Sequence, residues 1–258
     1  MKENGQKDLK SQKGKRTRMR RVLTALAVVA LVLVCTAGVC FLYVNDYYHR
    51  TGDVPGYLED TNQVKVSEFE YGLFFDGSGE DTAFIFYPGA KVEYTAYAPL
   101  MQKLACQGID CFLVHMPGNL AVLGQDRADS ILDSFDYEHW YIGGHSLGGA
   151  MAASYAASNL DKLDGAVLLG AYPTKSLKSE AFAVLSVYGS EDTVINREKL
   201  EAGREYMPQD YNEVCIQGGN HAQFGNYGEQ DKDGTAAISR EEQQEQTVSA
   251  IVEMVRGQ

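Results

Sequence analysis

From Val64 onward, short apolar runs alternate with segments of helical pattern, and this alternation constrains the fold more than any other feature. Strands are expected over Thr82–Tyr87, Asp110–His115, Glu138–Gly143, Gly165–Gly170, Ala181–Tyr188 and Tyr211–Gln217, after one or two strands in Val64–Phe75. Helices are expected around Tyr94–Gln107 and over Leu120–Ser134, Leu147–Ala157, Val194–Tyr206 and Arg240–Arg256. Apolar strands separated by such helices predict an α/β fold, with a mostly parallel central sheet covered by helices on both faces.

The segment Gly144–Gly148 has the pattern G-x-S-x-G and lies where an expected strand runs directly into an expected helix. In this context the pattern predicts a nucleophile elbow, a sharp turn that projects the serine hydroxyl above the carboxyl edge of the sheet. Glycines are needed there because neighbouring Cβ atoms would collide in so tight a turn. Ser146 is therefore the candidate nucleophile; an ordinary capping serine is the plainer alternative.

A serine hydroxyl is a weak nucleophile and needs a base within hydrogen-bond reach. When an elbow supplies the nucleophile, the order along the chain is serine, acid, histidine. Of the five histidines only His221 follows Ser146, in a loop after the last expected strand. His139 lies near the start of a strand, at the wrong edge. His115 ends a strand at the correct edge, and we expect it to contact substrate in the cleft.

The acid of such a triad orients the histidine and stabilises its charged form. Asp192 follows the expected strand Ala181–Tyr188 through a short turn, at the correct edge of the sheet. Glu191 is the alternative acid, and a turn-forming aspartate without a catalytic role is the plainer interpretation. We therefore predict a catalytic triad of Ser146, Asp192 and His221.

Backbone N–H groups must also stabilise the oxyanion that forms during acyl transfer. One donor is expected at Leu147, the residue after the nucleophile, and the second in the loop Pro88–Lys91. Ala90 is the expected second donor and Lys91 its alternative. Lys91 is also a candidate substrate contact. A plain strand-to-helix turn is the competing interpretation of this loop.

The chain resembles compact bacterial α/β-hydrolases related to dienelactone hydrolase in five segments taken together, which are YPGAKVEYTAYAPL, LVHMPGNLAVL, IGGHSLGGAMAASYA, VYGSEDTV and GGNHAQFGNYG. The resemblance extends over about Thr82 to Ser239. It implies an α/β-hydrolase fold and a serine hydrolase of esterase type that needs no cofactor. Dienelactone hydrolases carry a cysteine nucleophile, and Ser146 takes that place here, which argues against lactone specificity.

These residues predict hydrolysis of small carboxylic esters through an acyl-enzyme intermediate, without a metal or a cofactor. An acyltransferase or a peptidase with the same triad is the nearest alternative, since only the acyl acceptor or donor differs. A catalytically silent, membrane-anchored binding protein on the same scaffold is the alternative from another class, because a fold by itself does not prove a function.

An uncharged run of 23 residues, Val22–Val44, is long enough to span a bilayer as a helix. Nine of the 23 Lys and Arg but only two of the 35 Asp and Glu precede it, which leaves the rest of the chain near −19. The basic flank predicts an uncleaved signal-anchor with the N-terminus in the cytoplasm and the catalytic domain outside. A cleaved signal peptide is the alternative. The acidic body argues against binding to nucleic acid.

The sequence therefore divides into four parts. We expect a basic tail without regular structure over residues 1–21, a transmembrane helix over 22–44, a linker over 45–63 and an α/β-hydrolase domain over 64–258. The segment Ala171–Glu180 is too short to form a cap domain, and Ala222–Ser239 lacks the large apolar residues of a lipid-binding lid. We expect an open active site that acts on small, soluble esters.

Overall fold

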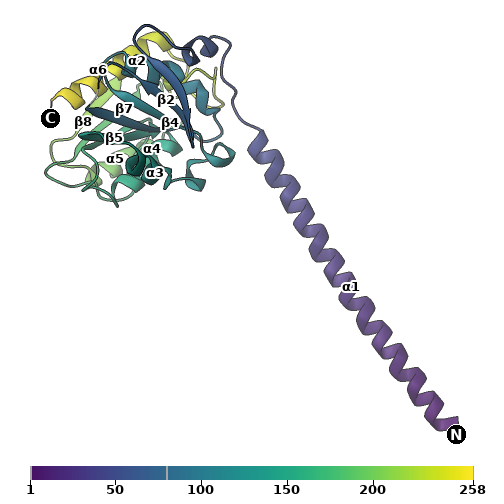
Figure 1. The fold of residues 1–258 in the computed structure, drawn as a ribbon. Helices are drawn as coiled ribbons and strands as arrows, with labels where there is room; N and C mark the ends of the chain where they lie inside the picture. Colours follow the sequence, from purple (N-terminus) through teal and green to yellow (C-terminus); the bar gives the residue numbers. More distant parts are fainter. Residues whose placement is uncertain (1, 80, 258) are drawn as a thin grey trace. The chain divides into compact units, whose positions relative to one another are not determined.

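The computed structural model describes residues 2–79 and 81–257 and divides the chain into two units, one up to Asp46 and one from Tyr47 onward (Figure 1). The second unit is built on one eight-stranded sheet in the order β1-β2-β4-β3-β5-β6-β7-β8. Its strands are β1 Lys65–Phe69, β2 Gly72–Asp76, β3 Thr82–Tyr87, β4 Asp110–Val114, β5 His139–His145, β6 Gly165–Leu169, β7 Ala183–Gly189 and β8 Asn212–Ile216. β1, β2 and β4 pair antiparallel, and all pairings from β4 to β8 are parallel.

Helices cover both faces of this sheet, as the alternation predicts (Figure 1). The α-helices of the second unit are α2 Ala98–Ala105, α3 Arg127–Ser134, α4 Leu147–Ala156, α5 Arg197–Gly203 and α6 Arg240–Arg256. Short 3₁₀ turns are η1 Val54–Leu58, η2 Tyr94–Tyr97, η3 Pro117–Asn119, η4 Ala121–Leu123, η5 Arg204–Tyr206 and η6 Ala222–Phe224. The α/β fold with a mostly parallel central sheet is therefore confirmed.

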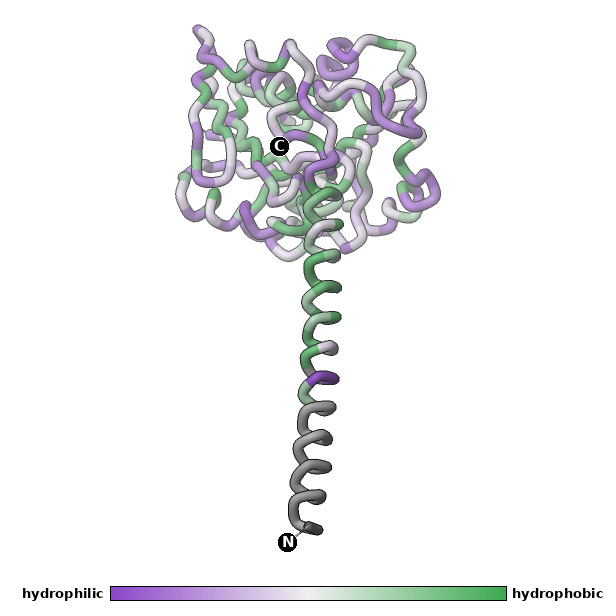
Figure 2. The backbone as a smooth tube through the Cα atoms, turned by 90° about the vertical axis from the view of Figure 1, so that its right-hand side faces the viewer, coloured by the Kyte–Doolittle hydropathy of each residue, from purple (hydrophilic) through white to green (hydrophobic). Residues whose placement is uncertain are grey.

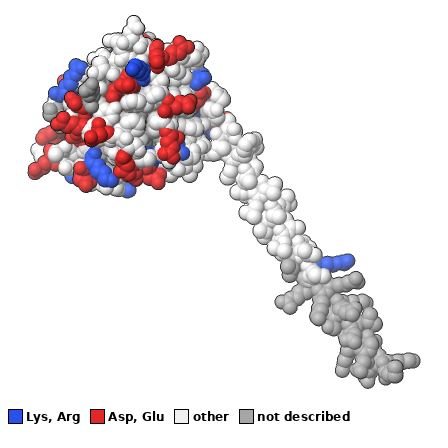
Figure 3. Space-filling view, viewed as in Figure 1, with Lys and Arg blue, Asp and Glu red and all other residues white. Residues whose placement is uncertain are grey.

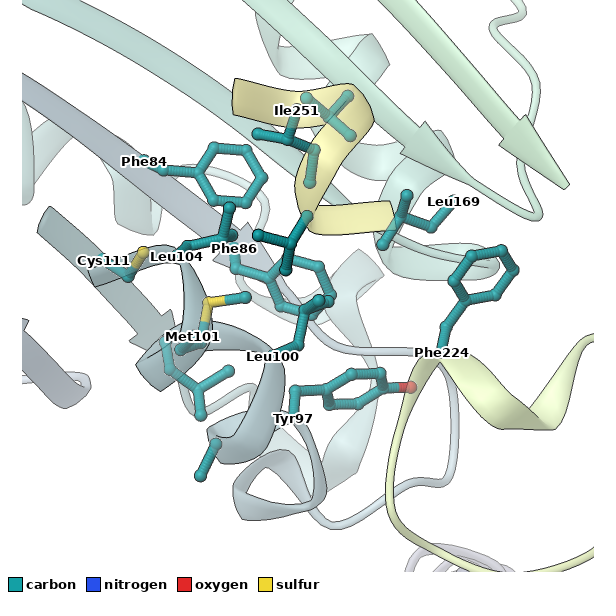
Figure 4. Packing of buried hydrophobic residues seen from close by; sticks show 14 of the residues in the cluster. Phe84, Phe86, Tyr97, Leu100, Met101, Leu104, Cys111, Leu169, Phe224 and Ile251 are labelled. Carbon is teal, nitrogen blue, oxygen red and sulfur yellow. The ribbon is translucent and has the colours of Figure 1, made fainter. Parts of the chain in front are cut away.

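The alternation of side chains along β3 produces two separate cores. Phe84 and Phe86 join a cluster with residues of α2 and α6, whereas Ile85 and Tyr87 join a cluster with residues of α3 and α4. Successive side chains of a strand point to opposite faces, and helices on both sides bury both sets. Figure 4 shows part of the first cluster, including Phe84 and Phe86.

One expected helix is shorter in the structure. The segment Leu120–Ser134 begins with the turn η4, and only α3 is α-helical. Gly124 separates the two with φ −153° and ψ 35°, which is outside the helical region. The first part of this prediction is wrong. It depended on apolar residues, and two of them, Val122 and Leu123, are exposed on the surface.

The segment expected to be a linker is largely part of the folded domain. From Tyr47 onward the chain belongs to the second unit, and Val54 is fully buried in the first core cluster. The backbone of Tyr48 bonds that of Lys91 and Glu93 at 2.7 and 2.9 Å. The breakers Gly52, Pro55 and Gly56 therefore shape a packed turn instead of a flexible connection.

The first unit contains one helix, α1, from Lys2 to Asn45. The tail 2–21, expected to lack regular structure, is helical, and that expectation is wrong. Within α1, Met19–Asn45 is long and apolar enough to cross a membrane, a property that signal sequences share. Large apolar side chains are exposed from Leu23 to Leu42, and Figure 2 shows the hydrophobic colour along this stretch.

Carboxylates dominate the charged surface of the second unit. Figure 3 shows Asp and Glu side chains distributed over the visible face, with Lys and Arg between them. This distribution agrees with the net charge of −12 that the whole chain carries despite its basic N-terminal residues.

Candidate active site

The turn between β5 and α4 holds Ser146 in a strained backbone conformation. Its φ of 53° and ψ of −122° lie outside the regions that side-chain-bearing residues prefer. The Ser146 N–H donates to the carbonyl of Leu169 at 2.9 Å, which fixes the turn to the neighbouring strand β6. A Cβ on Gly148 would lie 2.1 Å from the carbonyl oxygen of Tyr87, so this position requires glycine.

His221 and Asp192 form a buried pair at the same edge of the sheet. The Nδ1 atom of His221 lies 2.7 Å from Oδ2 of Asp192, and the two side chains are 1% and 0% exposed. The other carboxylate oxygen of Asp192 accepts backbone N–H bonds from Val194 at 2.9 Å and Ile195 at 2.8 Å. These bonds fix the carboxylate so that it faces the imidazole.

Glu191, the alternative acid, does not reach this histidine. Its side chain is exposed, and its carboxylate accepts a hydrogen bond from the Ser190 hydroxyl at 2.9 Å. Between the two acids of this turn, the structure pairs Asp192 with the imidazole of His221.

The loop that carries His221 is fixed by α6. The side chain of Gln243 accepts from the N–H of Asn220 at 2.9 Å and donates to its carbonyl at 2.8 Å. The Ala222 N–H donates to the carboxylate of Asp233 at 2.8 Å. Both chain neighbours of His221 are thus held, so the imidazole has a defined position although it comes from a loop rich in glycine.

Ser146 and His221 line one cavity of about 510 Å³. Among the described residues, Nε2 of His221 has no hydrogen-bond partner. Gly170 lies beside the pair with φ +53°, and a Cβ there would come within 2.9 Å of Nδ1 of His221 and 3.3 Å of Oδ2 of Asp192. Only glycine can occupy this position without displacing the imidazole.

The structure separates the two candidates for the second oxyanion donor. The Lys91 N–H donates to the carbonyl of Asn119 at 2.8 Å, so the prediction of Lys91 as alternative donor is wrong. In the described part of the chain Ala90 N–H makes no hydrogen bond. Leu147 lines the cavity as the first residue of α4, where helix N–H groups have no intrahelical acceptor.

The two expected substrate contacts lie outside this cavity. His115 stacks on Tyr94, with 4.7 Å between ring centroids, and lines a separate pocket of about 420 Å³ together with Arg127. Burial and the Arg127 charge lower the pKa of His115. Lys91 is likewise not among the residues that line the cavity of Ser146. The structure therefore does not bring His115 and Lys91 together with Ser146 and His221.

Most walls of the cavity come from two loops that the sequence motifs did not single out. The loop after β6 and the segment from the end of the Asp192 turn through α5 to η5 provide Tyr172, Pro173, Thr174, Val194, Ile195, Asn196, Lys199 and Tyr206. Both follow strands at the carboxyl edge, so the rule that indicated the candidate triad residues also indicated these loops. Among the described residues that line the cavity there is no carboxylate, and Lys199 is the one with a permanent charge.

The described residues contain no group of three His, Cys, Asp or Glu side chains arranged to hold a metal ion. At this edge of the sheet the described residues provide a hydroxyl, an imidazole, a carboxylate and backbone N–H groups. These are the components of nucleophilic acyl transfer.

Comparisons with known proteins agree with this fold. The sequence model of the alpha/beta hydrolase family matches residues 83–245, and no curated protein matches the chain. Dienelactone hydrolase from Anabaena variabilis is 14% identical with a TM-score of 0.56, covering 76% of this chain and 99% of its own. Carboxylesterase CesB from Bacillus subtilis is 9% identical with a TM-score of 0.56, covering 85% and 98%.

Carboxyl esterase 2 from the fungus Tuber melanosporum is 11% identical, with a TM-score of 0.55, and covers 81% of this chain and 91% of its own. At such identities the structures show a shared fold and not a shared substrate. The family model spans more than half of the chain, and the protein therefore belongs to the alpha/beta hydrolase family.

Proposed function

We propose that this protein is a serine hydrolase that cleaves small carboxylic esters with Ser146, His221 and Asp192 as its catalytic triad. The observation that carries the proposal is the buried 2.7 Å contact between His221 and Asp192, at a cavity that Ser146 also lines. The strained backbone of Ser146 is the second support, since strain at a nucleophile elbow exposes the hydroxyl.

In the proposed reaction the Ser146 hydroxyl attacks the ester carbonyl while Nε2 of His221 accepts its proton. The imidazolium then gives that proton to the leaving alcohol, and an acyl-enzyme remains on Ser146. Water attacks the acyl-enzyme in a second round with the same proton transfers. Asp192 holds the imidazole and stabilises its charge, and the N–H groups of Leu147 and Ala90 are the proposed oxyanion donors.

The loops around the cavity support a small substrate. The chain between β6 and β7 carries no helix in the described residues, so no cap domain covers the cavity from this loop. The loop after His221 packs against other parts of the domain, with Phe224 and Tyr227 buried. We expect simple saturation with short-chain esters and no sharp increase in rate when an ester exceeds its solubility limit.

Substitution of the proposed nucleophile and base tests this function. Ser146→Ala and His221→Ala should each lower kcat for a short-chain ester by at least ~10³-fold, and the double variant should be scarcely worse, because triad members act as a unit. Ser154→Ala and His139→Ala are matched controls at a buried serine of α4 and a surface histidine of β5. Substantial activity in His221→Ala would reject the triad.

The apolar part of α1 supports a second aspect of the proposal, a membrane anchor with the hydrolase domain outside the cytoplasm. Protease added to intact protoplasts should then remove the domain, whereas a cytoplasmic marker should survive. If the domain remains protected until the cells are lysed, the proposed orientation is wrong. A mature protein that starts beyond residue 44 would instead indicate a cleaved signal peptide.

A further inference from the structure

A second histidine lies directly beside the proposed base. His145 precedes Ser146 in the elbow, and its side chain is buried. Its ring centroid is 4.4 Å from that of His221 and 5.5 Å from that of Phe224. The reaction described above does not use this imidazole, although it contacts the ring that must accept the proton.

His145 is connected on its other side to the loop of the proposed oxyanion donor. Its Nδ1 atom lies 2.8 Å from the hydroxyl of Tyr97, and the N–H of Gly89 donates to the same hydroxyl oxygen at 3.2 Å. Tyr97 ends the turn η2 and is fully buried in the first core cluster, where Figure 4 shows its ring. Gly89 immediately precedes Ala90, so one hydrogen-bonded chain joins that loop to the His145 ring.

The Gly89 N–H is a donor, so the Tyr97 oxygen accepts from it. The direction of the bond between Tyr97 and Nδ1 of His145 depends on the histidine tautomer. We assign the tautomer with its proton on Nε2, because it lets the phenol donate its proton to Nδ1, whereas in the other tautomer Nδ1–H would donate to the phenol oxygen and leave the phenol proton unused in this chain. Close packing enforces the contact, because a Cβ on Gly89 would lie 2.8 Å from the Tyr97 oxygen and 2.9 Å from Nδ1 of His145.

The side chains of Tyr97 and His145 are both uncharged near neutral pH. Complete burial and the neighbouring His221 hold the pKa of His145 well below its ordinary value. Burial likewise raises the pKa of the Tyr97 phenol. A neutral pair does not compete with His221 for its proton or with Asp192 for the resulting charge, so its contribution is geometric.

We propose that Tyr97 and His145 form a positioning pair, which holds the loop of the Ala90 oxyanion donor in register with the imidazole of His221. The proposal rests on the proposed hydrolase function. Oxyanion donors act only when they are preorganised at the place where charge develops, and supporting hydrogen bonds provide that order. The pair fixes the distance between the donor loop and the base, which come from opposite sides of Ser146 along the chain.

Removing only the phenol oxygen tests this link. Tyr97→Phe keeps the ring in the core but leaves Gly89 N–H without its acceptor and Nδ1 of His145 without its donor. We expect kcat to fall by roughly tenfold with little change in KM, because the loss concerns the transition state and not substrate binding. The affinity for a boronic acid that forms a tetrahedral adduct should fall in parallel.

Tyr155→Phe is the matched control. Tyr155 is also buried and donates its hydroxyl to Asp129 at 2.6 Å, but it belongs to the other core cluster. The Tyr155→Phe substitution should lower thermal stability about as much as Tyr97→Phe does, but it should leave kcat and the boronate affinity unchanged. A merely structural role of Tyr97 predicts the same kinetics for both variants, and kcat of Tyr97→Phe within twofold of the control would overturn the proposal.

Two substitutions of His145 provide an independent measurement. In His145→Asn the amide oxygen can take the place of Nδ1 as acceptor for Tyr97, whereas His145→Leu offers no acceptor. Asn should therefore retain more of kcat than Leu at similar KM, and equal kcat values would contradict the positioning role. Ser146→Ala under the same assay separates the two proposals, since a Ser146→Ala variant that remains active overturns the hydrolase mechanism itself.

Discussion

Two loops meet at the cavity, and they are held very differently. The loop after β8, residues 217–239, carries His221 and includes Asn226, whose backbone and side chain both bond to distant segments. Asn226 donates to the Ala96 carbonyl and the Asp53 carboxylate, each at 2.7 Å, and accepts from Thr51 N–H and Gln244, each at 2.8 Å. The loop after β6, residues 170–182, provides cavity walls. It is held to distant segments by two backbone bonds, from the Gly170 N–H to the Val187 carbonyl and from the Leu177 N–H to the Tyr206 carbonyl, each at 2.8 Å.

The contrast indicates that the two loops have different roles, one in positioning a proposed catalytic group and the other in surrounding the substrate. The proposed base must be placed closely against its proton donor, and the bonds that tie the chain around His221 to α6 and to the segment after α1 would provide that placement. A wall that surrounds a substrate can vary without loss of the chemistry, as is common for loops at this edge of α/β sheets. Substitutions in the two loops should therefore affect different properties.

Among substitutions that leave the proposed triad unchanged, the largest effect is expected where the two loops touch. Gly170→Ala places a Cβ within 3.0 Å of the His221 ring in a left-handed conformation. The imidazole must move, and a shift of about 1 Å at a catalytic group lowers the rate by ~10²-fold. Steady-state kinetics on a short-chain ester measures this, and circular dichroism checks the fold. Full activity in Gly170→Ala would mean that the imidazole position is not critical.

A smaller loss is expected from the loop of His221 itself. Asn226→Ala removes the 2.8 Å bond that the buried Gln244 side chain donates and the 2.7 Å bond that the Asp53 carboxylate accepts. The free energy of unfolding should fall by about 1–3 kcal/mol, and kcat should fall with it. Asn159→Ala, which removes a local bond to the Tyr155 carbonyl, is the control in urea unfolding and should change stability by less. Equal stability losses for Asn226→Ala and Asn159→Ala would show that the bonds of Asn226 to distant segments stabilise the domain no more than a local bond does.

Acid should loosen the same region through His145, which packs against Phe224 of this loop. The folded pKa of His145 is lowered from 6.5, so the unfolded chain gains a proton first as the pH falls. The contribution of this group to stability is present above pH 6.5 and is lost below it, at up to about 1.4 kcal/mol per pH unit.

The non-titrating variant His145→Asn isolates this contribution. Its unfolding free energy, measured in urea between pH 7 and pH 5, should fall less steeply than that of the unchanged protein. Parallel curves for the two proteins would show that His145 does not remain neutral in the folded state.

The smallest effect is expected in the walls of the cavity, at Thr174 in the loop after β6 and at Lys199 in α5. Thr174→Ala and Lys199→Ala change side chains that line the cavity without a described role in holding His221. KM or the preference among acyl chains should change by a few-fold, while kcat for the best ester and thermal stability remain close to those of the unchanged protein. A loss of kcat as large as that of Gly170→Ala would contradict the difference in roles proposed for the two regions.

Sequence patterns were sufficient for the features that local chemistry determines. Apolar runs and helical periodicity predicted the strands and most helices, and the order of Ser146, Asp192 and His221 along the chain predicted which residues meet at one edge. They failed for the segment 45–63, because its breakers indicate a turn but not what the turn packs against. The burial of Val54 depends on a core assembled from distant residues.

The surroundings of the candidate triad were also beyond the sequence. His145 was recognised only as a member of the elbow, and Tyr97 only as part of a helical stretch, since the bond between them joins positions 48 residues apart. For Gly170, the sequence indicated only a place at the end of a strand and not its contact with His221. Assigning His115 to the cleft used the correct edge but ignored how far β4 lies from β5, with β3 between them.

Covalent labelling of the full-length protein by a fluorophosphonate tests the central claim most directly. Such a probe reacts with a serine that an adjacent base activates, and peptide mass spectrometry identifies the residue. The proposed function predicts one modified site, Ser146, with labelling abolished in Ser146→Ala and greatly slowed in His221→Ala. Absence of labelling in the unchanged protein, or modification at another serine at the same rate in His221→Ala, would contradict the assignment of the active site.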